Sequence, residues 1–182
     1  MNSQQNNPLT PGRYFFALSP DTSSRMQIQH IMKRLPDDSA LKLQTTANLH
    51  QTLLFLGQLE QQQINALLKQ TESIHFPAIN MQFDHLSYWE EPKIFCLTSR
   101  DPDTELYNLV SQLEYIASEA GINVEVKPYR PHITLARKAS VPLDVPIAPV
   151  CFKAEQLVLM KSVSTEHGAQ YQPMMQWPVM AV

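Results

Sequence analysis

Residues 128–135 read PYRPHITL, a proline-flanked turn that leads into a short apolar strand. Alternate side chains of a strand point to the same face, so His132 and Thr134 share one face while Ile133 and Leu135 share the other. A strand that buries one face in a core therefore presents an imidazole and a hydroxyl side by side on the other.

The same pattern occurs in residues 48–57, NLHQTLLFLG, where His50 and Thr52 are again two positions apart. A lone histidine in a strand is most often a hydrogen-bonded structural residue. The chain has 6 histidines, however, and random placement gives two HxTL strings roughly once in a thousand shuffles. The repeat therefore favours one site built from both strands.

Two histidines and two hydroxyls suit chemistry at phosphorus. Near neutral pH an imidazole acts as a general base or as a general acid. In-line displacement uses both, because the attacking and leaving oxygens lie on opposite sides of the phosphorus. Thr52 and Thr134 can donate to non-bridging phosphate oxygens, and Arg130 can hold the phosphate or stabilise charge that builds during the transfer.

The net charge of −3 does not mark the whole molecule as a nucleic-acid binder, so any polyanion site must be a local basic patch. Such a patch surrounds the second motif, where the basic residues are Lys127, Arg130, Arg137 and Lys138. We therefore expect the anion to be held mainly from the second strand. The alternative for Lys127, Arg137 and Lys138 is an ordinary cluster of solvated charges at a strand end.

The remaining patterns argue against several other kinds of site. The other histidines form no HxxxH or HExxH pattern, and Cys96 and Cys151 lack metal-ligand spacing, so we expect no zinc site and two reduced core thiols. The chain has no GxSxG, phosphate-binding or dinucleotide-binding glycine motif. Tyr88, Trp89 and Tyr129 are candidates for stacking a nucleobase, although isolated aromatics near turns commonly pack instead.

The composition predicts a cytoplasmic globular protein. The chain is 43% hydrophobic and 17% charged, and no apolar run approaches the ~18 residues of a membrane span. Residues 1–11 are polar and lack the basic and apolar segments of a secretory signal. We expect residues 1–11 to be a disordered lead-in and residues 12–182 to form a single bilobal domain.

Hydrophobic periodicity predicts a mixture of strands and helices. Strands are expected at 13–18, 48–56, 79–86, 94–98, 124–127, 132–137, 152–163 and 171–179, and helices between Asp21 and Pro36, at 60–71 and at 102–120. The prolines within residues 140–149 predict a surface loop. Because some strands are joined by short turns and others by helices, the pattern predicts an α+β fold, and its order around the two motifs indicates two related lobes.

The two HxTL strands resemble the paired motifs of the 2H phosphoesterase superfamily, and most closely its bacterial and archaeal RNA 2′,3′-cyclic phosphodiesterases, also called 2′–5′ RNA ligase-like or LigT/ThpR-type proteins. The resemblance extends to RYFFAL (13–18), LVLMKSVS (157–164) and YQPMMQWPV (171–179). It implies a bilobal, pseudo-two-fold arrangement of two antiparallel-rich sheets flanked by helices, with the histidines facing each other across a central cleft. Family members often carry a tryptophan where this chain reads IFCLTS (94–99), which leaves its nucleobase preference open.

The resemblance also implies an activity: metal-independent hydrolysis of RNA 2′,3′-cyclic phosphate ends to 2′-phosphomonoesters. His50 would donate a proton to the leaving 3′ oxygen, and His132 would accept a proton from the attacking water. Thr52, Thr134 and Arg130 would bind the phosphate. No metal or nucleotide cofactor is implied, and the expected partner of this monomeric protein is an RNA end, tRNA fragments included.

Other interpretations of the paired motifs stay open. The same chemistry serves a cyclic phosphodiesterase for a small nucleotide, or 2′–5′ RNA end-joining in the reverse direction, although the high concentration of water favours hydrolysis. A protein that kept the pocket without catalysis would be an RNA-end binder. If the two strings were coincidental, His50 and His132 would lie on different surfaces.

Overall fold

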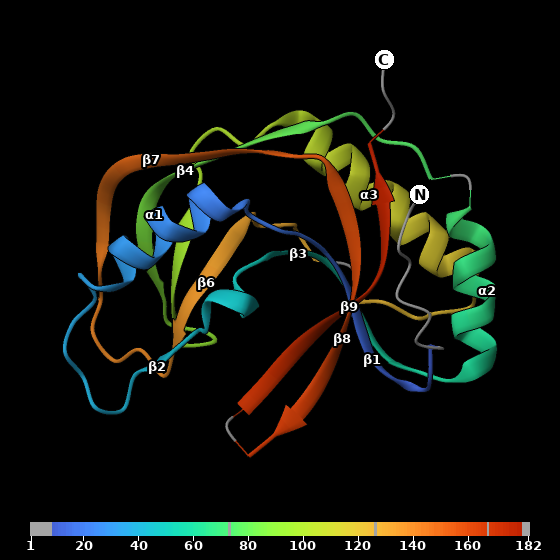
Figure 1. Ribbon diagram of the computed structural model, residues 1–182, viewed down its shortest axis with the longest axis horizontal. Coiled ribbons are helices and arrows are strands. Elements are labelled where there is room, and N and C mark those ends of the chain that lie inside the picture. The colour runs from blue at the N-terminus through green and yellow to red at the C-terminus, as the bar shows by residue number, and fades with distance from the viewer. Residues whose placement is uncertain (1–8, 73, 126, 167, 180–182) are drawn as a thin grey trace.

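A computed structural model of the chain describes residues 9–72, 74–125, 127–166 and 168–179. Most of the expected lead-in, residues 1–8, lies outside these ranges. The strands are β1 (Gly12–Leu18), β2 (Lys42–Leu43), β3 (Gln51–Leu59), β4 (Ile79–Trp89), β5 (Ile94–Thr98), β6 (His132–Arg137), β7 (Asp144–Ala154), β8 (Gln156–Thr165) and β9 (Gly168–Pro178). The helices are α1 (Thr22–Met32), α2 (Gln61–Thr71) and α3 (Thr104–Glu119), and a short 3₁₀ turn, η1 (Thr46–Asn48), precedes β3. This mixture of hairpins and helical connections is the predicted α+β fold (Figure 1).

Throughout the described part of the chain the strands form one antiparallel sheet, in the order β7-β4-β5-β6-β3-β1-β8-β9, with β2 paired to β6. The order divides into two halves, and each half begins at the centre with one of the HxTL strands, β6 or β3. The halves are joined where β3 meets β6, through the pair Gln51↔Ile133. The two sheets implied by the resemblance are therefore two halves of one continuous sheet.

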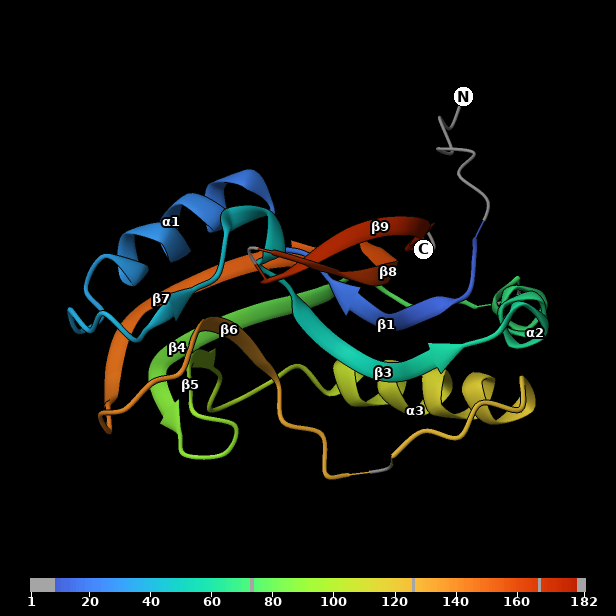
Figure 2. The ribbon, with the colours of Figure 1, turned by 90° about the horizontal axis from the view of Figure 1, so that it is seen from below.

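The main core lies between one face of this sheet and the helices. Along β1, Tyr14, Phe16 and Leu18 belong to the main core, whereas Phe15 and Ala17 pack in a small separate cluster on the opposite face. This division follows from the alternation of side chains along a strand. Figure 2 shows α3 lying along β3 and α1 lying over β7, and both helices contribute to this core.

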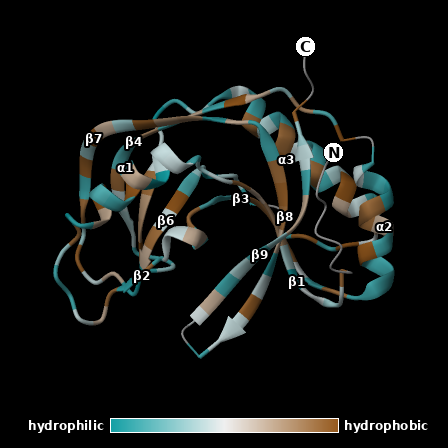
Figure 3. Ribbon diagram, viewed as in Figure 1, coloured by the Kyte–Doolittle hydropathy of each residue, from teal (hydrophilic) through white to brown (hydrophobic). Residues whose placement is uncertain are grey.

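The helices bury the stripes that the sequence predicts. The buried residues of α3 are Leu106, Leu109, Val110, Leu113, Ile116 and Ala117. Gly121 follows the helix with φ +69°, a left-handed conformation that favours glycine after a helix C-terminus. The outer side of α2 is hydrophilic (Figure 3), whereas its Ile64 and Leu67 are buried. No helix among the described residues is long and apolar enough to cross a membrane.

Two of the predicted elements are wrong. Most of the proline-containing segment 140–149 belongs to β7, not to a loop. Proline lacks a backbone N–H, but β7 is an edge strand, so the N–H groups missing at Pro146 and Pro149 do not cost a second neighbouring strand its hydrogen bonds. Residues 124, 125 and 127 belong to no helix or strand, and residue 126 is outside the described ranges. A short alternating stretch becomes a strand only where it finds a partner edge.

Both cysteines are free, as expected, but only one is a core thiol. Cys96 lies buried in β5, and burial raises its pKa to about 12. Cys151 lies exposed on β7. The expectation for Cys151 is wrong because alternation along the edge strand turns this side chain outward while Val150 and Phe152 face inward.

Candidate active site

The two HxTL motifs meet at the centre of the sheet. The antiparallel pair Gln51↔Ile133 places Thr52 across from His132, and His50 across from Thr134. Gln51 and Ile133 are 0% exposed and point into the core. Both histidines and both threonines therefore share the opposite face, so the structure brings the four residues together as the repeat predicts.

The backbone fixes which nitrogen of His50 carries the proton. Nδ1 lies 2.6 Å from the carbonyl oxygen of Asn48 and donates to it. In the neutral ring the other nitrogen, Nε2, is then unprotonated, and it lies 2.9 Å from the hydroxyl of Thr52. Nε2 is thus the atom of His50 that can exchange protons on the open face of the sheet.

His132 is held in the same way. Its Nδ1 donates to the carbonyl oxygen of Arg130 at 2.8 Å, two residues before the ring. The Nε2 atom is therefore the basic nitrogen of the neutral ring. A matching backbone contact holds each histidine, so the two half-sites repeat in detail as well as in sequence.

Aromatic and apolar side chains surround His50. The ring of Phe15 lies 5.0 Å from the imidazole, and the ring of Tyr171 lies 4.9 Å away in a T-shaped arrangement. Phe55 on β3 lies 5.8 Å from Phe15 and is 66% exposed. Beside Tyr171 is a hollow of about 420 Å³, whose lining includes Arg25. This half of the site therefore offers apolar surface to a ligand.

Beside His132, polar side chains of β5, β4 and β7 form a row. Thr98 on β5 pairs with His132 across the strands. The hydroxyl of Thr98 lies 2.9 Å from that of Ser87, which in turn donates to Asp144 at 3.1 Å. A hydrogen-bonded chain thus crosses from β5 over β4 to β7 beside the histidine.

An aromatic ring also lies against His132. Trp89, at the end of β4, has its ring centre 4.5 Å from the imidazole. The guanidinium of Arg130 lies over the same indole, 3.8 Å from the ring centre. Trp89 precedes the β4–β5 turn, whereas the family tryptophan that the sequence lacks would follow it.

The pKa of each histidine is lowered from its usual value near 6.5. For His50 the main cause is burial, which together with the positive charges of His132, Arg137 and Arg25 lowers the pKa to about 4. Burial likewise lowers the pKa of His132, and the charges of Arg130 and Arg137 act in the same direction. In both cases the hydrogen bond to the backbone carbonyl acts against these causes. Both rings are therefore neutral at pH 7 in the free protein.

Two predicted site residues are held by contacts that the sequence alone did not reveal. Arg130 is exposed and stacks on Trp89 beside the histidine pair. The hydroxyl of Tyr129 accepts from Gln51 at 2.8 Å and donates to the carbonyl of Thr52 at 2.9 Å. Since Gln51 points into the core, Tyr129 lies behind β3, and burial raises its pKa above the usual range.

Other residues of the site do not stand out in the sequence. Arg137 is one of several basic neighbours of the second motif there, yet its charge acts on both histidines. Phe15, Tyr171 and Asn48 are not among the predicted site residues. Arg137 follows the second motif directly and Asn48 precedes the first, so proximity was a usable signal for these two. Phe15 and Tyr171 lie beside His50 because of how β1 and β9 pack, and no local sequence pattern predicts this.

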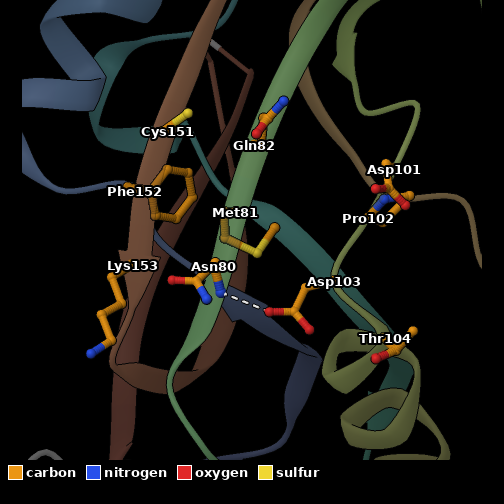
Figure 4. Close-up of a pocket in the computed structure, with 10 residues that line it drawn as sticks. All are labelled: Asn80, Met81, Gln82, Asp101, Pro102, Asp103, Thr104, Cys151, Phe152 and Lys153. Atoms are coloured by element: carbon orange, nitrogen blue, oxygen red, sulfur yellow. Dashed lines mark hydrogen bonds between the residues drawn. The ribbon is translucent and has the colours of Figure 1, made fainter.

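A second groove, of about 640 Å³, lies away from the histidines, between β4, β7 and the start of α3 (Figure 4). Asp103 caps α3 and accepts the backbone N–H of Asn80 at 3.1 Å, and Lys153 points away from it. None of the predicted site residues lines this groove. Over the described ranges, no three histidine, cysteine or carboxylate side chains are grouped to hold a metal ion.

Known proteins are similar to this chain in sequence and in fold. The family model described as LigT-like phosphoesterase matches residues 18–95 and 97–167, which include both motifs. The chain is 28% identical over 169 residues to a protein of Escherichia coli (strain K12) named RNA 2′,3′-cyclic phosphodiesterase, covering 92% of this chain and 96% of that one.

Solved structures give the same result. The structure of E. coli LigT in apo form has a TM-score of 0.84 at 28% identity, covering 95% of this chain and 100% of that one. The structure of E. coli LigT complexed with 3′-AMP has a TM-score of 0.87 at 27% identity, with 94% and 99% covered. The fold expected from the paired motifs is thereby confirmed.

Proposed function

Because the chain belongs to the family of LigT-like phosphoesterases, we propose that it hydrolyses RNA ends that carry a 2′,3′-cyclic phosphate and leaves a 2′-phosphomonoester. Water attacks the phosphorus, a P–O bond forms, and the bond from phosphorus to the 3′ oxygen breaks. His132 Nε2 takes the proton of the attacking water, and His50 Nε2 gives a proton to the leaving 3′ oxygen. The reaction uses no metal ion and no nucleotide cofactor.

One observation carries the proposal. On one face of the sheet, two imidazoles each donate Nδ1–H to a backbone carbonyl, so that each keeps Nε2 for proton exchange. Such a pair supplies the base and the acid of a single displacement. The adjoining hydroxyls of Thr52 and Thr134 would donate to the phosphate oxygens.

The surroundings of the rings support the assignment of roles. In an in-line displacement the nucleoside stays on the side of the leaving oxygen, and the water enters from the opposite side. Phe55, which is exposed, and Tyr171 offer a surface for a nucleoside on the His50 side, with the buried Phe15 packed beneath them. Thr98 and Ser87 offer hydrogen-bonding groups on the His132 side. The leaving oxygen then lies near His50 and the water near His132.

Substrate binding itself would prepare His50 as an acid. A general acid must be protonated, and a pKa of about 4 leaves His50 neutral in the free protein at pH 7. A negatively charged phosphate between the rings favours the imidazolium and raises that pKa. Arg130 and Arg137, whose positive charges lower the pKa of His132 in the free protein, would also attract and hold the negatively charged phosphate.

The decisive experiment incubates the protein with a short RNA that ends in a 2′,3′-cyclic phosphate, with EDTA present, and identifies the product by mass and phosphatase sensitivity. We expect a 2′-phosphate. A 3′-phosphate would reverse the assignment of the leaving oxygen, and activity that requires an added metal ion would overturn the mechanism. The absence of product, with the oligonucleotide still bound in an equilibrium titration, would make the protein an RNA-end binder. Turnover of cyclic mononucleotides alone would make it a small-nucleotide phosphodiesterase.

A further inference from the structure

Asn48 is a buried polar residue that the mechanism above does not use. It ends η1, two residues before His50, and is 7% exposed. Its backbone carbonyl accepts the Nδ1–H of His50 at 2.6 Å. Its side chain points elsewhere, toward a strand more than a hundred residues away in sequence.

The carboxamide of Asn48 bonds the outer edge of β9 at two points. Nδ2 donates to the carbonyl of Ala169 at 2.8 Å, and Oδ1 accepts the N–H of Tyr171 at 3.3 Å. These two backbone groups flank Gln170, and a residue on a neighbouring parallel strand would bond the same pair. One side chain thus takes the place of a missing strand at the sheet edge.

This anchor determines what lies over the catalytic ring. The N–H that bonds Asn48 belongs to Tyr171, whose ring meets the imidazole of His50 at 4.9 Å and 84°. The same tyrosine ring lies 5.0 Å from Phe15. The β8–β9 hairpin projects beyond the rest of the sheet (Figure 1), so an anchor near its distal end restrains its approach to His50.

We propose that Asn48 is the positioning residue of His50: its carbonyl holds Nδ1–H, and its carboxamide docks β9 so that Tyr171 packs against the ring. The inference rests on the proposed function, because it assumes that Nε2 of His50 is the reacting atom. It adds a residue that acts through His50 and touches no substrate.

The other half of the site uses the same device. Arg130 stands two residues before His132, accepts its Nδ1–H through the backbone carbonyl, and covers Trp89 with its guanidinium. Trp89 in turn packs against His132. In each half one residue therefore contacts both the histidine and the aromatic residue beside it: Asn48 through the backbone of Tyr171, and Arg130 through the ring of Trp89.

The test compares Asn48→Ala with a matched control, Ser24→Ala. Ser24 is 1% exposed, and its hydroxyl donates to the carbonyl of Cys151 on β7, the opposite edge strand. Both substitutions remove a buried side-chain bond to a sheet edge, but only Asn48 borders a histidine of the pair. Asn48→Ala is expected to lower kcat on cyclic-phosphate RNA by about 10- to 100-fold with little change in KM, whereas Ser24→Ala leaves kcat unchanged.

A second readout needs no substrate. In ¹⁵N NMR spectra, His50 of the native chain is expected to carry its proton on Nδ1. Asn48→Ala keeps the backbone carbonyl but releases the turn that presents it from β9, so the proton is expected to shift toward a mixture of both tautomers. If Tyr171 no longer packs on His50, water also reaches the imidazole. The pKa of His50 then rises from about 4, while the charges of His132, Arg137 and Arg25 stay in place. Ser24→Ala leaves both signals unchanged.

Unchanged tautomer, titration and kcat in folded Asn48→Ala protein would overturn the proposal, since Asn48 would then be structural like Ser24. If that variant does not fold, Asn48→Asp keeps the acceptor for Tyr171 N–H and loses the donor to Ala169, and the same three measurements apply. A native chain without activity but with the Nδ1–H tautomer that depends on Asn48 would reject the reaction and retain the positioning role.

Discussion

The two halves of the site differ in the side chains around each histidine, although the backbone hydrogen bond to each histidine is the same. His50 and His132 each donate Nδ1–H to the carbonyl two residues earlier, at 2.6 and 2.8 Å. Around His50, however, the neighbours are the rings of Phe15 and Tyr171. Around His132 they are Trp89 and the hydrogen-bonded chain that begins at Thr98.

This difference suggests a structural origin for the asymmetry of the proposed reaction. The repeated strand with its carbonyl contact makes two equivalent bases, each with Nε2 available. Neighbouring strands then distinguish them: β1 and β9 bring apolar rings to His50, while β5 and β4 bring hydroxyls to His132. In the proposed mechanism, repetition provides the proton-transfer groups, and the strands outside the repeat assign acid and base.

The largest effect is expected from the histidines themselves. His50→Gln and His132→Gln should each lower kcat on cyclic-phosphate RNA by about 10²- to 10⁴-fold, the usual contribution of a general acid or base. The two variants should differ on bis(4-nitrophenyl) phosphate, whose nitrophenolate leaves without protonation. Relative to the native chain, His50→Gln should regain most of its activity on this ester, while His132→Gln should remain impaired.

The control is His30→Gln, which changes an exposed histidine of α1. It should keep full activity on both substrates. The reverse pattern, with the nitrophenyl ester rescuing His132→Gln only, would exchange the acid and the base. Equal rescue of both would mean that the different surroundings do not assign the roles.

Much of this arrangement can be predicted from the sequence, because local rules govern it. Strand alternation places His132 and Thr134 on one face, and a helical stripe ending at Gly121 predicts α3 closely. Both predictions use neighbours within a few residues. The meeting of the two motifs follows from their repetition, which is also a sequence property.

What could not be predicted depends on contacts between distant segments. Tyr129 is an aromatic residue that could stack on a nucleobase, but its hydroxyl hydrogen-bonds to Gln51 and to the backbone carbonyl of Thr52 behind β3. The prolines of β7 resemble a loop until the strand is known to lie at the sheet edge. Tyr171 reaches His50 only because β9 folds back along β8.

A second prediction uses pH to compare the two halves through stability. The pKa of His50 is about 4 in the folded chain and near 6.5 when unfolded. On acidification through this window the unfolded chain binds the proton first, so the free energy of unfolding falls by about 3 kcal/mol between pH 6.5 and 4. His132, whose pKa is also lowered, acts in the same direction.

Urea unfolding of the native chain, His50→Gln and His132→Gln at several pH values measures these contributions. His50→Gln should remove the larger part of the acid-sensitive stability, because apolar rings surround that histidine. His30→Gln, which removes an exposed histidine outside the pair, is the matched control. If His132→Gln instead reduces the pH dependence of the free energy of unfolding more than His50→Gln, burial lowers the pKa of His132 more than that of His50, and the proposed difference between the two halves is wrong.

The smallest expected effect separates the two threonines. Thr52 contacts His50 Nε2 at 2.9 Å, whereas no side-chain hydrogen bond to Thr134 is formed by the residues that the structure describes. Thr134→Val should remove one hydrogen bond to a charged phosphate and lower kcat/KM by about 10-fold. Thr52→Val should lower it several-fold further, because the variant also loses a contact that orients the proposed acid.

The double variant decides between these two causes. If Thr52 acts on the phosphate alone, the losses in kcat/KM multiply and the pH profile of each single variant matches that of the native chain. If Thr52 also orients His50, the pH profile moves in Thr52→Val and not in Thr134→Val, since only one of the two hydroxyls touches an imidazole. Equal losses with unmoved profiles would make the threonines equivalent, and would leave the aromatic and polar surroundings as the remaining difference between the two halves.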